Sequence, residues 1–313
     1  MPPLSEPIRR LRACVLLPAL ACSLAAAAPR AVEPAGIVTI LEGDASALQG
    51  TARTGVVEGQ LLAPTAIVET GARTGLLRIE TGDGTAIDLG PDTRVMLSPP
   101  GFAARGRKTP PLYVLNGWVK LSAPAVGAGI VGMVSPWFGM PSQKGVAVAF
   151  VSADGAAVFL ESGQAQLVER RGGKSGATLA LKNTEFYARA GADRGAVTAR
   201  ASPAMLERMP RAFRDTLPRR AAVFEGREVE PRPLAAPSYA ELQPWLAGEP
   251  ALRRPFTRRF VVRARESDFR RSLVTNMRSH PEWYPVLFPP EPEEKKNAAA
   301  PPGRAGSYVG FGR

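Results

Sequence analysis

The side chains that carry most nucleophilic and metal chemistry are scarce in this chain. It has one histidine, His280, and two cysteines, Cys14 and Cys22, both close to the N-terminus. A Ser-His-Asp triad needs an imidazole beside its nucleophile, and zinc sites need several converging His, Cys or acidic ligands. We therefore expect no catalytic activity, no metal site and no cofactor, and we expect His280 to be a packed or solvent-facing residue.

Acidic pairs are the remaining candidates for catalysis. Glu42 with Asp44, and Asp83 with Asp88, are spaced closely enough to supply the two carboxylates that glycoside cleavage requires. Carboxylates in turns and at strand ends more often form turns or solvated faces. An envelope hydrolase is therefore the least favoured of three functional hypotheses.

A concentration of arginines lies near the C-terminus. The chain has 40 Lys and Arg against 28 Asp and Glu, a net charge of +12. Guanidinium groups suit phosphates and carboxylates, which makes these arginines candidates for binding an anionic surface. The candidate residues are Arg253, Arg254, Arg258, Arg259, Arg263, Arg265, Arg270 and Arg271. The alternative is the solvated face of short amphipathic helices.

The N-terminus has the pattern of an export signal. A basic head ending at Arg12 precedes an apolar run and the small residues Ala25–Ala28, so residues 1–27 are predicted to be a signal peptide. A lipid-anchored alternative uses Cys22 as the first mature residue. Either way we expect a periplasmic protein, whose available polyanions are lipids, lipopolysaccharide, wall polymers and acidic proteins rather than nucleic acid. No later apolar run reaches the ~20 residues that span a membrane.

The elements that would position any site are short strands. Leu76–Glu80 and Ala86–Leu89 flank Gly82-Asp83-Gly84, and Asp-Gly supplies the positive φ angles of a tight turn. Strands recur about every ten residues over 36–100, and after a basic loop at 101–111 a second strand set covers 112–201. This predicts a mainly β fold, either an antiparallel sandwich or a short β-solenoid.

The period changes after residue 201. Ser202-Pro203 is a good helix start, and we expect short helices over 202–217. Residues 218–237 contain four prolines and read as a linker or extended strap. Residues 238–289 are predicted to be a small helical, arginine-rich extension, and 290–313 a disordered tail.

The first strand set resembles the periplasmic domain of the FecR family. The resemblance covers 36–100 well and 112–170 loosely, and it rests on the order of motifs such as Ile67–Gly71, Ile87-x-Leu89-Gly90-Pro91-x-Thr93 and Leu115-Asn116-Gly117-Trp118-Val119. Members of this family relay receptor occupancy to a sigma factor. Only the predicted export signal precedes Gly36 here, where those relays carry an anti-sigma segment and a membrane helix. We therefore expect the family's fold and envelope location, and not its sigma-regulating role.

Together these patterns favour an exported, non-catalytic binding or scaffold module of the cell envelope. Its expected partners are an envelope protein or glycan, with anionic lipid or lipopolysaccharide contacting the arginine-rich extension. The alternative is an accessory in cell-surface signalling that contacts an outer-membrane receptor or sensor through β-edge pairing.

Overall fold

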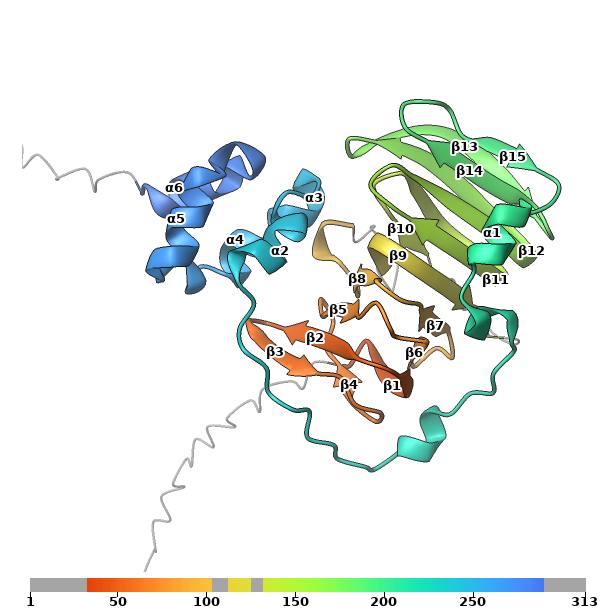
Figure 1. Ribbon diagram of the computed structural model, residues 1–313, viewed down its shortest axis with the longest axis horizontal. Helices are drawn as coiled ribbons and strands as arrows, with labels where there is room; N and C mark the ends of the chain where they lie inside the picture. Colours follow the sequence, from red (N-terminus) through yellow and green to blue (C-terminus); the bar gives the residue numbers. More distant parts are fainter. Residues whose placement is uncertain (1–32, 103–111, 125–131, 290–313) are drawn as a thin grey trace, which may run out of the picture. The chain divides into compact units, whose positions relative to one another are not determined.

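The computed structural model describes residues 33–102, 112–124 and 132–289. The predicted signal peptide with Cys22, most of the basic loop at 101–111 and the predicted tail at 290–313 lie outside the described residues. The described residues belong to one compact unit. Within them, fifteen strands form one connected sheet (Figure 1).

Strand pairing and burial divide this sheet into two layers that face each other. In the first layer the strands follow the order β3 (Ala52–Gly55), β2 (Ala45–Gln49), β5 (Ile67–Thr70), β8 (Arg94–Met96), the start of β9 (Leu112–Ser122), β10 (Met133–Val134), the start of β11 (Phe138–Val151), the end of β12 (Gly155–Arg171) and β13 (Lys174–Lys182). The short η1 helix (Pro100–Phe102) follows β8. Among the described strands, only β9 and β10 pair in parallel.

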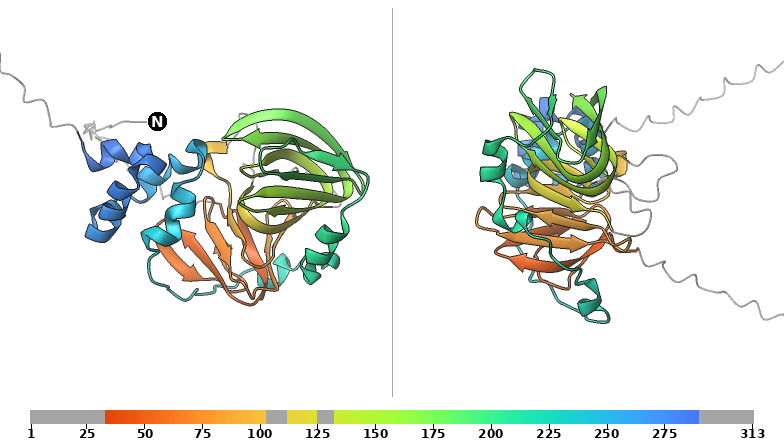
Figure 2. Two further views of the ribbon diagram at one scale, coloured as in Figure 1. Left: turned by 45° about the horizontal axis from the view of Figure 1, so that its top comes forward. Right: turned by 90° about the vertical axis from the view of Figure 1, so that its right-hand side faces the viewer.

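The second layer lies under the first. Its strands follow the order β4 (Leu61–Leu62), β1 (Gly36–Glu42), β6 (Leu76–Glu80), β7 (Ala86–Leu89), the end of β9, the end of β11, the start of β12, β14 (Phe186–Ala190) and β15 (Ala196–Thr198). Three long strands, β9, β11 and β12, therefore cross from one layer to the other, and Figure 2 shows how strongly β11 and β12 curve.

Each of the three crossing strands contains a glycine with a positive φ angle. Gly117 in β9 has φ +99°, and a Cβ there would lie 2.4 Å from the Cα of Thr93. Gly145 in β11 and Gly163 in β12 are register partners, with φ +92° and +93°. A Cβ on Gly163 would lie 1.8 Å from the carbonyl oxygen of Lys144. Only glycine fits such positions, because other residues clash or are strained at positive φ.

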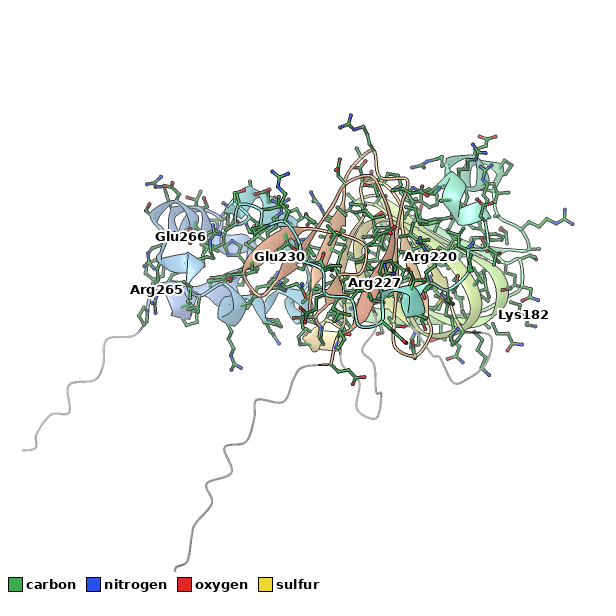
Figure 3. All side chains as sticks on the ribbon, turned by 90° about the horizontal axis from the view of Figure 1, so that it is seen from below. Lys182, Arg220, Arg227, Glu230, Arg265 and Glu266 are labelled. Atoms are coloured by element: carbon green, nitrogen blue, oxygen red, sulfur yellow. The ribbon has the colours of Figure 1, made fainter. Side chains whose placement is uncertain are left out.

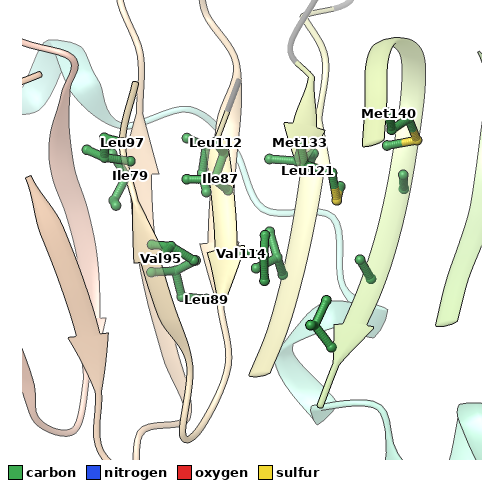
Figure 4. Close-up of a cluster of buried hydrophobic side chains, with 14 of the residues drawn as sticks. Ile79, Ile87, Leu89, Val95, Leu97, Leu112, Val114, Leu121, Met133 and Met140 are labelled. Carbon is green, nitrogen blue, oxygen red and sulfur yellow. The ribbon is translucent and has the colours of Figure 1, made fainter. Parts of the chain in front are cut away.

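One hydrophobic core fills the space between the layers and includes both strand sets. Alternate residues of most strands face it, as a pleated strand requires. In β8, for example, Val95 faces this core and Met96 faces outward. Figure 4 shows part of this core, including Ile79, Val95, Val114 and Met133 from neighbouring strands. The mainly β prediction is confirmed. The strands form a small five-stranded barrel with extra strands, and the crossing strands join its two layers.

Helical segments cover the outer faces of both layers. The outer face of the second layer packs against α1 (Pro203–Arg208) and η2 (Arg211–Arg214). The outer face of the first layer packs against the C-terminal helices. These are α2 (Tyr239–Leu246), α3 (Pro250–Arg253), α4 (Phe256–Arg259), η4 (Arg263–Arg265), α5 (Ser267–Thr275), η5 (Met277–Ser279), η6 (Pro281–Trp283) and α6 (Tyr284–Leu287). The small helical C-terminal region is thus confirmed.

An extended segment, residues 215–237, connects the two coverings and is called the strap here. It contains only the short η3 helix (Ala221–Phe224) and runs past β1, β4 and β3 (Figure 1). A capping box follows the strap: Ser238 Oγ accepts from the amide of Glu241, and the Glu241 carboxylate accepts from the Ser238 amide. In α5, Glu266 occupies the N-cap position without a side-chain capping hydrogen bond, and Ser267 is the first helical residue.

Candidate functional site

A surface groove of about 930 Å³ lies where β9 crosses between the layers. Strands β5, β8, β9 and β11, the turn before β11 and helix α1 all contribute to its walls. The side chains that give it chemical character are Glu69, Asp92, Arg94, Trp118, Trp137 and Phe150. We call it the crossover groove.

Two of the sequence motifs, the one ending at Thr93 and the one containing Asn116 and Trp118, form hydrogen bonds with each other at this groove. The Asn116 side chain donates to the carbonyl of Asp92 at 2.6 Å, and the Trp118 amide donates to Thr93 Oγ1 at 2.9 Å. Asp92 itself has φ +48°, a conformation that Asp tolerates better than most residues. These bonds join the turn at Asp92 and Thr93 directly to β9, next to the bend at Gly117. The same contacts therefore hold both the bend in β9 and this wall of the groove.

The aromatic side chains of the groove are fixed by their neighbours. The rings of Trp118 and Phe150 have centroids 4.7 Å apart, and the guanidinium of Arg208 lies 4.8 Å from the Phe150 ring. Trp137 Nε1 donates to the carbonyl of Ser152 at 2.8 Å. These contacts orient the apolar surfaces of the groove before any ligand arrives.

Charged groups at the rim are only loosely paired. The Arg94 side chain is 39% exposed, and its Nε lies 3.7 Å from Glu69 Oε1. That carboxylate oxygen also accepts from Trp245 Nε1 at 2.9 Å. Asp92 is exposed. The groove therefore offers a guanidinium and a carboxylate beside the half-buried rings of Trp137 and Phe150, behind which Trp118 is buried. This arrangement is suited to a polar ligand with apolar faces.

Two of the candidate catalytic carboxylates, Asp83 and Asp88, have structural roles. Asp83 accepts from the Thr85 amide at 3.1 Å and from the Thr81 hydroxyl. Burial alone would raise the pKa of Asp83, but these hydrogen bonds lower it below its usual value. Asp88 is buried and ion-paired with Arg78. Asp83 thus forms a turn, as the sequence suggested.

The Arg78–Asp88 pair belongs to a group of buried charged residues on the outer face of the second layer. Arg78 Nη1 donates to the strap carbonyl of Leu217 at 3.0 Å. Glu80 Oε1 accepts from the strap amide of Arg220 at 2.9 Å. Lys120 Nζ donates to the carbonyl of Phe213, just before the strap. These side chains bind backbone groups of the strap, and no motif in the sequence identified them.

The eight candidate arginines divide into two groups. Four are half-buried and bind within the protein: Arg253 pairs with Glu282 at 2.8 Å, Arg263 pairs with Glu266 at 2.9 Å, Arg270 donates to the carbonyl of Leu287 at 2.7 Å, and Arg259 donates to the carbonyls of Leu48, Gly50 and Thr65. Burial lowers the pKa of Arg259 to about 10. Arg259 thus attaches the helical extension to the β body, and the other three stabilise contacts within the extension.

The other four, Arg254, Arg258, Arg265 and Arg271, are exposed. Arg271 contacts Asp268 at 3.2 Å, yet its side chain is 75% exposed. Between Arg258 and Arg265 lie two exposed valines, Val261 and Val262, the second 62% exposed. Figure 3 shows Arg265 on the helical extension. This part of the extension combines cations with exposed apolar side chains.

His280 lies inside the helical extension. It is fully buried, and its Nε2 lies 3.0 Å from the Tyr239 hydroxyl. Burial lowers the pKa of His280. Backbone hydrogen bonding opposes this in part, nearby Arg253 lowers the pKa further, and Glu282 raises it slightly. It is therefore a packed residue, the first of the two alternatives given by the sequence. Within the described residues, no three His, Cys, Asp or Glu side chains are grouped as a metal site.

Among the described residues, no helix has the length and apolar character needed to cross a membrane.

No protein-family model matches the sequence, and no curated protein does. Two solved structures of a "putative anti-sigma factor" from Parabacteroides distasonis ATCC 8503 are similar in fold. One has a TM-score of 0.35 and 9% identity, the other a TM-score of 0.34 and 8% identity. Each match covers 43% of this chain, which spans 59% of the length of those structures. The described β-rich fold is thus distantly similar to that of a protein described as an anti-sigma factor.

Proposed function

We propose that this protein is an exported, non-catalytic binding module of the cell envelope, and that the crossover groove is its ligand site. The observation that carries the proposal is the preformed groove, in which fixed aromatic rings lie beside Arg94 and Asp92. Sugar rings have apolar faces and hydroxyl edges, which match such rings and such charged hydrogen-bonding groups. An envelope glycan is the ligand that we favour.

Titration with soluble wall-glycan fragments tests this proposal, because Trp118 and Trp137 line the groove and report binding by fluorescence. Arg94→Ala should weaken binding about tenfold through the loss of a charged hydrogen-bond donor. Arg227→Ala on the strap, labelled in Figure 3, is the matched control. Arg227 is exposed and is not among the residues that line the groove. Equal affinity of the Arg94 variant and the control would contradict the assignment.

We further propose that the exposed arginines of the helical extension attach the module to anionic lipid or lipopolysaccharide. Arg258 and Arg265, with exposed Val262 between them, combine charge attraction with apolar burial at a membrane surface. Basic residues near an anionic surface contribute about 1 kcal/mol each. Loss of both arginines should therefore weaken attachment roughly 30-fold.

Co-sedimentation with vesicles containing phosphatidylglycerol, compared with vesicles of phosphatidylcholine alone, measures this attachment. The test variant is Arg258→Gln with Arg265→Gln. Arg194→Gln with Arg200→Gln removes the same charge from exposed positions around β15 and serves as the control. Binding that ignores lipid charge or salt, or that both double variants reduce equally, would reject the proposal.

A second candidate is the signalling accessory suggested by the FecR-like motif order. It is supported by the fact that the Gly90–Thr93 and Asn116–Trp118 motifs interlock at one place in the fold. Chemical cross-linking in intact envelopes distinguishes the candidates. A single outer-membrane receptor or sensor recovered at equal stoichiometry favours signalling, whereas recovery of wall glycan without such a receptor favours the binding module.

A further inference from the structure

The two ends of the first layer are protected differently. At one end the strap covers the edge strand β3: the Gly55 amide donates to the carbonyl of Arg232 at 2.8 Å, and the Leu234 amide donates to the carbonyl of Arg53 at 2.9 Å. At the other end β13 pairs with β12 on one side only. Within the described residues no strand pairs with its outer side.

The backbone groups on the outer side of β13 can be identified. The Lys182 amide donates to the carboxylate of Glu185, and the Lys182 carbonyl accepts from the Glu185 amide, so both groups point away from β12. Backbone direction alternates along an antiparallel strand, and alternate residues share it. The N–H and C=O groups of Ala180 and Thr178 therefore line the free edge.

The interior of this edge, between its two terminal lysines, lacks charge and proline, two of the features that usually prevent strand addition. Edge strands are commonly protected by charges, proline or a covering segment. Between Lys174 and Lys182 the sequence of β13 contains no charged residue and no proline. An edge of nine residues is long enough to pair with an added strand.

The charges around the edge indicate what kind of strand fits it. Lys174 and Lys182 stand at its two ends, and Arg171 is the cross-strand neighbour of Lys174. A second copy pairing antiparallel about Thr178 would place Lys174 opposite the second copy's Lys182, a like-charge contact that is destabilising. A strand with acidic residues at both ends would place opposite charges there instead.

We propose that the outer edge of β13 is a docking site for an extended segment of another protein, acidic at both ends, that adds as a strand to the first layer. Main-chain hydrogen bonds supply the affinity and the terminal lysines select the partner by charge. Figure 3 labels Lys182 at this edge. The site is separate from the crossover groove, and the proposal stands or fails without it.

A synthetic strand tests the proposal on the full-length protein. The probe is a fluorescein-labelled peptide with the length of β13, nine residues, alternating threonine and valine with glutamate at each end. The comparison peptide has lysine at each end. Fluorescence anisotropy should show the acidic peptide binding roughly fivefold more tightly, because two opposite-charge cross-strand pairs replace two like-charge pairs.

Two variants of β13 make the test specific. Ala180→Pro removes an outward N–H while leaving the β12 ladder intact, which edge positions tolerate, and should weaken binding about tenfold. Lys174→Glu with Lys182→Glu should reverse the preference between the peptides, and it keeps the test valid if the proline variant does not fold. Arg94→Ala, in the groove, should leave peptide binding unchanged.

Three results would overturn the proposal. One is absence of binding, or equal binding of both peptides. Another is binding that neither β13 variant alters. The third is a concentration-dependent dimer, seen by sedimentation and abolished by Ala180→Pro, which would assign the edge to self-pairing.

Discussion

Removing Asp88 should strongly destabilise the protein. Its carboxylate forms two hydrogen bonds with Arg78, at 2.6 and 2.8 Å, and the side chains are only 2% and 3% exposed. Burial alone would lower the pKa of Arg78, but the hydrogen bonds and charge of Asp88 raise it, so this guanidinium stays charged. Asp88→Ala leaves that buried charge without its partner, at an expected cost of about 3–5 kcal/mol in the free energy of unfolding.

Replacing both members of the pair separates charge compensation from packing. Arg78→Met combined with Asp88→Leu removes both charges of this pair together, an exchange that is often close to neutral for stability. It also removes the hydrogen bond from Arg78 to the carbonyl of Leu217 in the strap. Hydrogen bonds from charged donors contribute about 1.5–3 kcal/mol. The double variant should therefore lose about that amount, less than the single variant.

Urea unfolding followed by tryptophan fluorescence and circular dichroism measures these free energies. The rate of trypsin cleavage after Arg219 or Arg220 adds a local measurement. A strap released from the sheet exposes the peptide bonds after these two arginines to the protease. Asp154→Ala is the control, since Asp154 is exposed and should change stability by no more than about 0.5 kcal/mol. A single variant as stable as the control, or a double variant less stable than the single one, would refute the reasoning.

Three further changes test other features. The pKa of His280 is lowered in the folded state, so its contribution to the free energy of unfolding should be full above the unfolded pKa of about 6.5 and should fall as pH decreases below it. Thermal melts at pH 7.5 and 5.5 should show this decline in stability. His280→Phe should make stability less dependent on pH over this range. Gly163→Ala should cost about 3 kcal/mol or prevent folding because its Cβ meets a carbonyl, whereas Gly172→Ala, with positive φ but open space, should cost only about 1–2 kcal/mol in urea titrations. Ser238→Ala should cost about 1 kcal/mol of unfolding free energy through loss of the α2 cap, and a calorimetric melting temperature equal to wild type would exclude that role.

Local patterns were sufficient to predict individual strands. Leu76–Glu80 and Ala86–Leu89 are the strands β6 and β7, with the predicted turn between them. Alternation and Asp-Gly turns act over a few residues, so they are visible in one sequence. The crossing of β9, β11 and β12 between layers was not predictable, because a glycine such as Gly117 looks the same in a turn and in a bent strand.

Long-range polar contacts were equally invisible in the sequence. The candidate arginines looked alike in spacing and number, yet Arg259 is bound by three carbonyls of the β body, one in strand β2 and two in loops, and Arg258 next to it is exposed. That difference depends on which loops lie beneath the helix. The groove was missed for a similar reason: its motifs were noticed as strand and turn signals, and only their meeting in space reveals a cavity.

The way the sheet holds the strap has a consequence for how this protein can change over evolutionary time. Arg78 and Lys120 bind peptide carbonyls, which every residue supplies, and Glu80 binds an amide N–H, which every residue except proline supplies. The path of the strap is therefore fixed partly through its backbone, in addition to side chains such as Leu217, Arg219 and Phe224 that pack on or bond to the β body. Exposed positions such as Asp215 and Thr216 can vary without losing that path, so this segment is suited to acquiring new recognition surfaces on an unchanged scaffold.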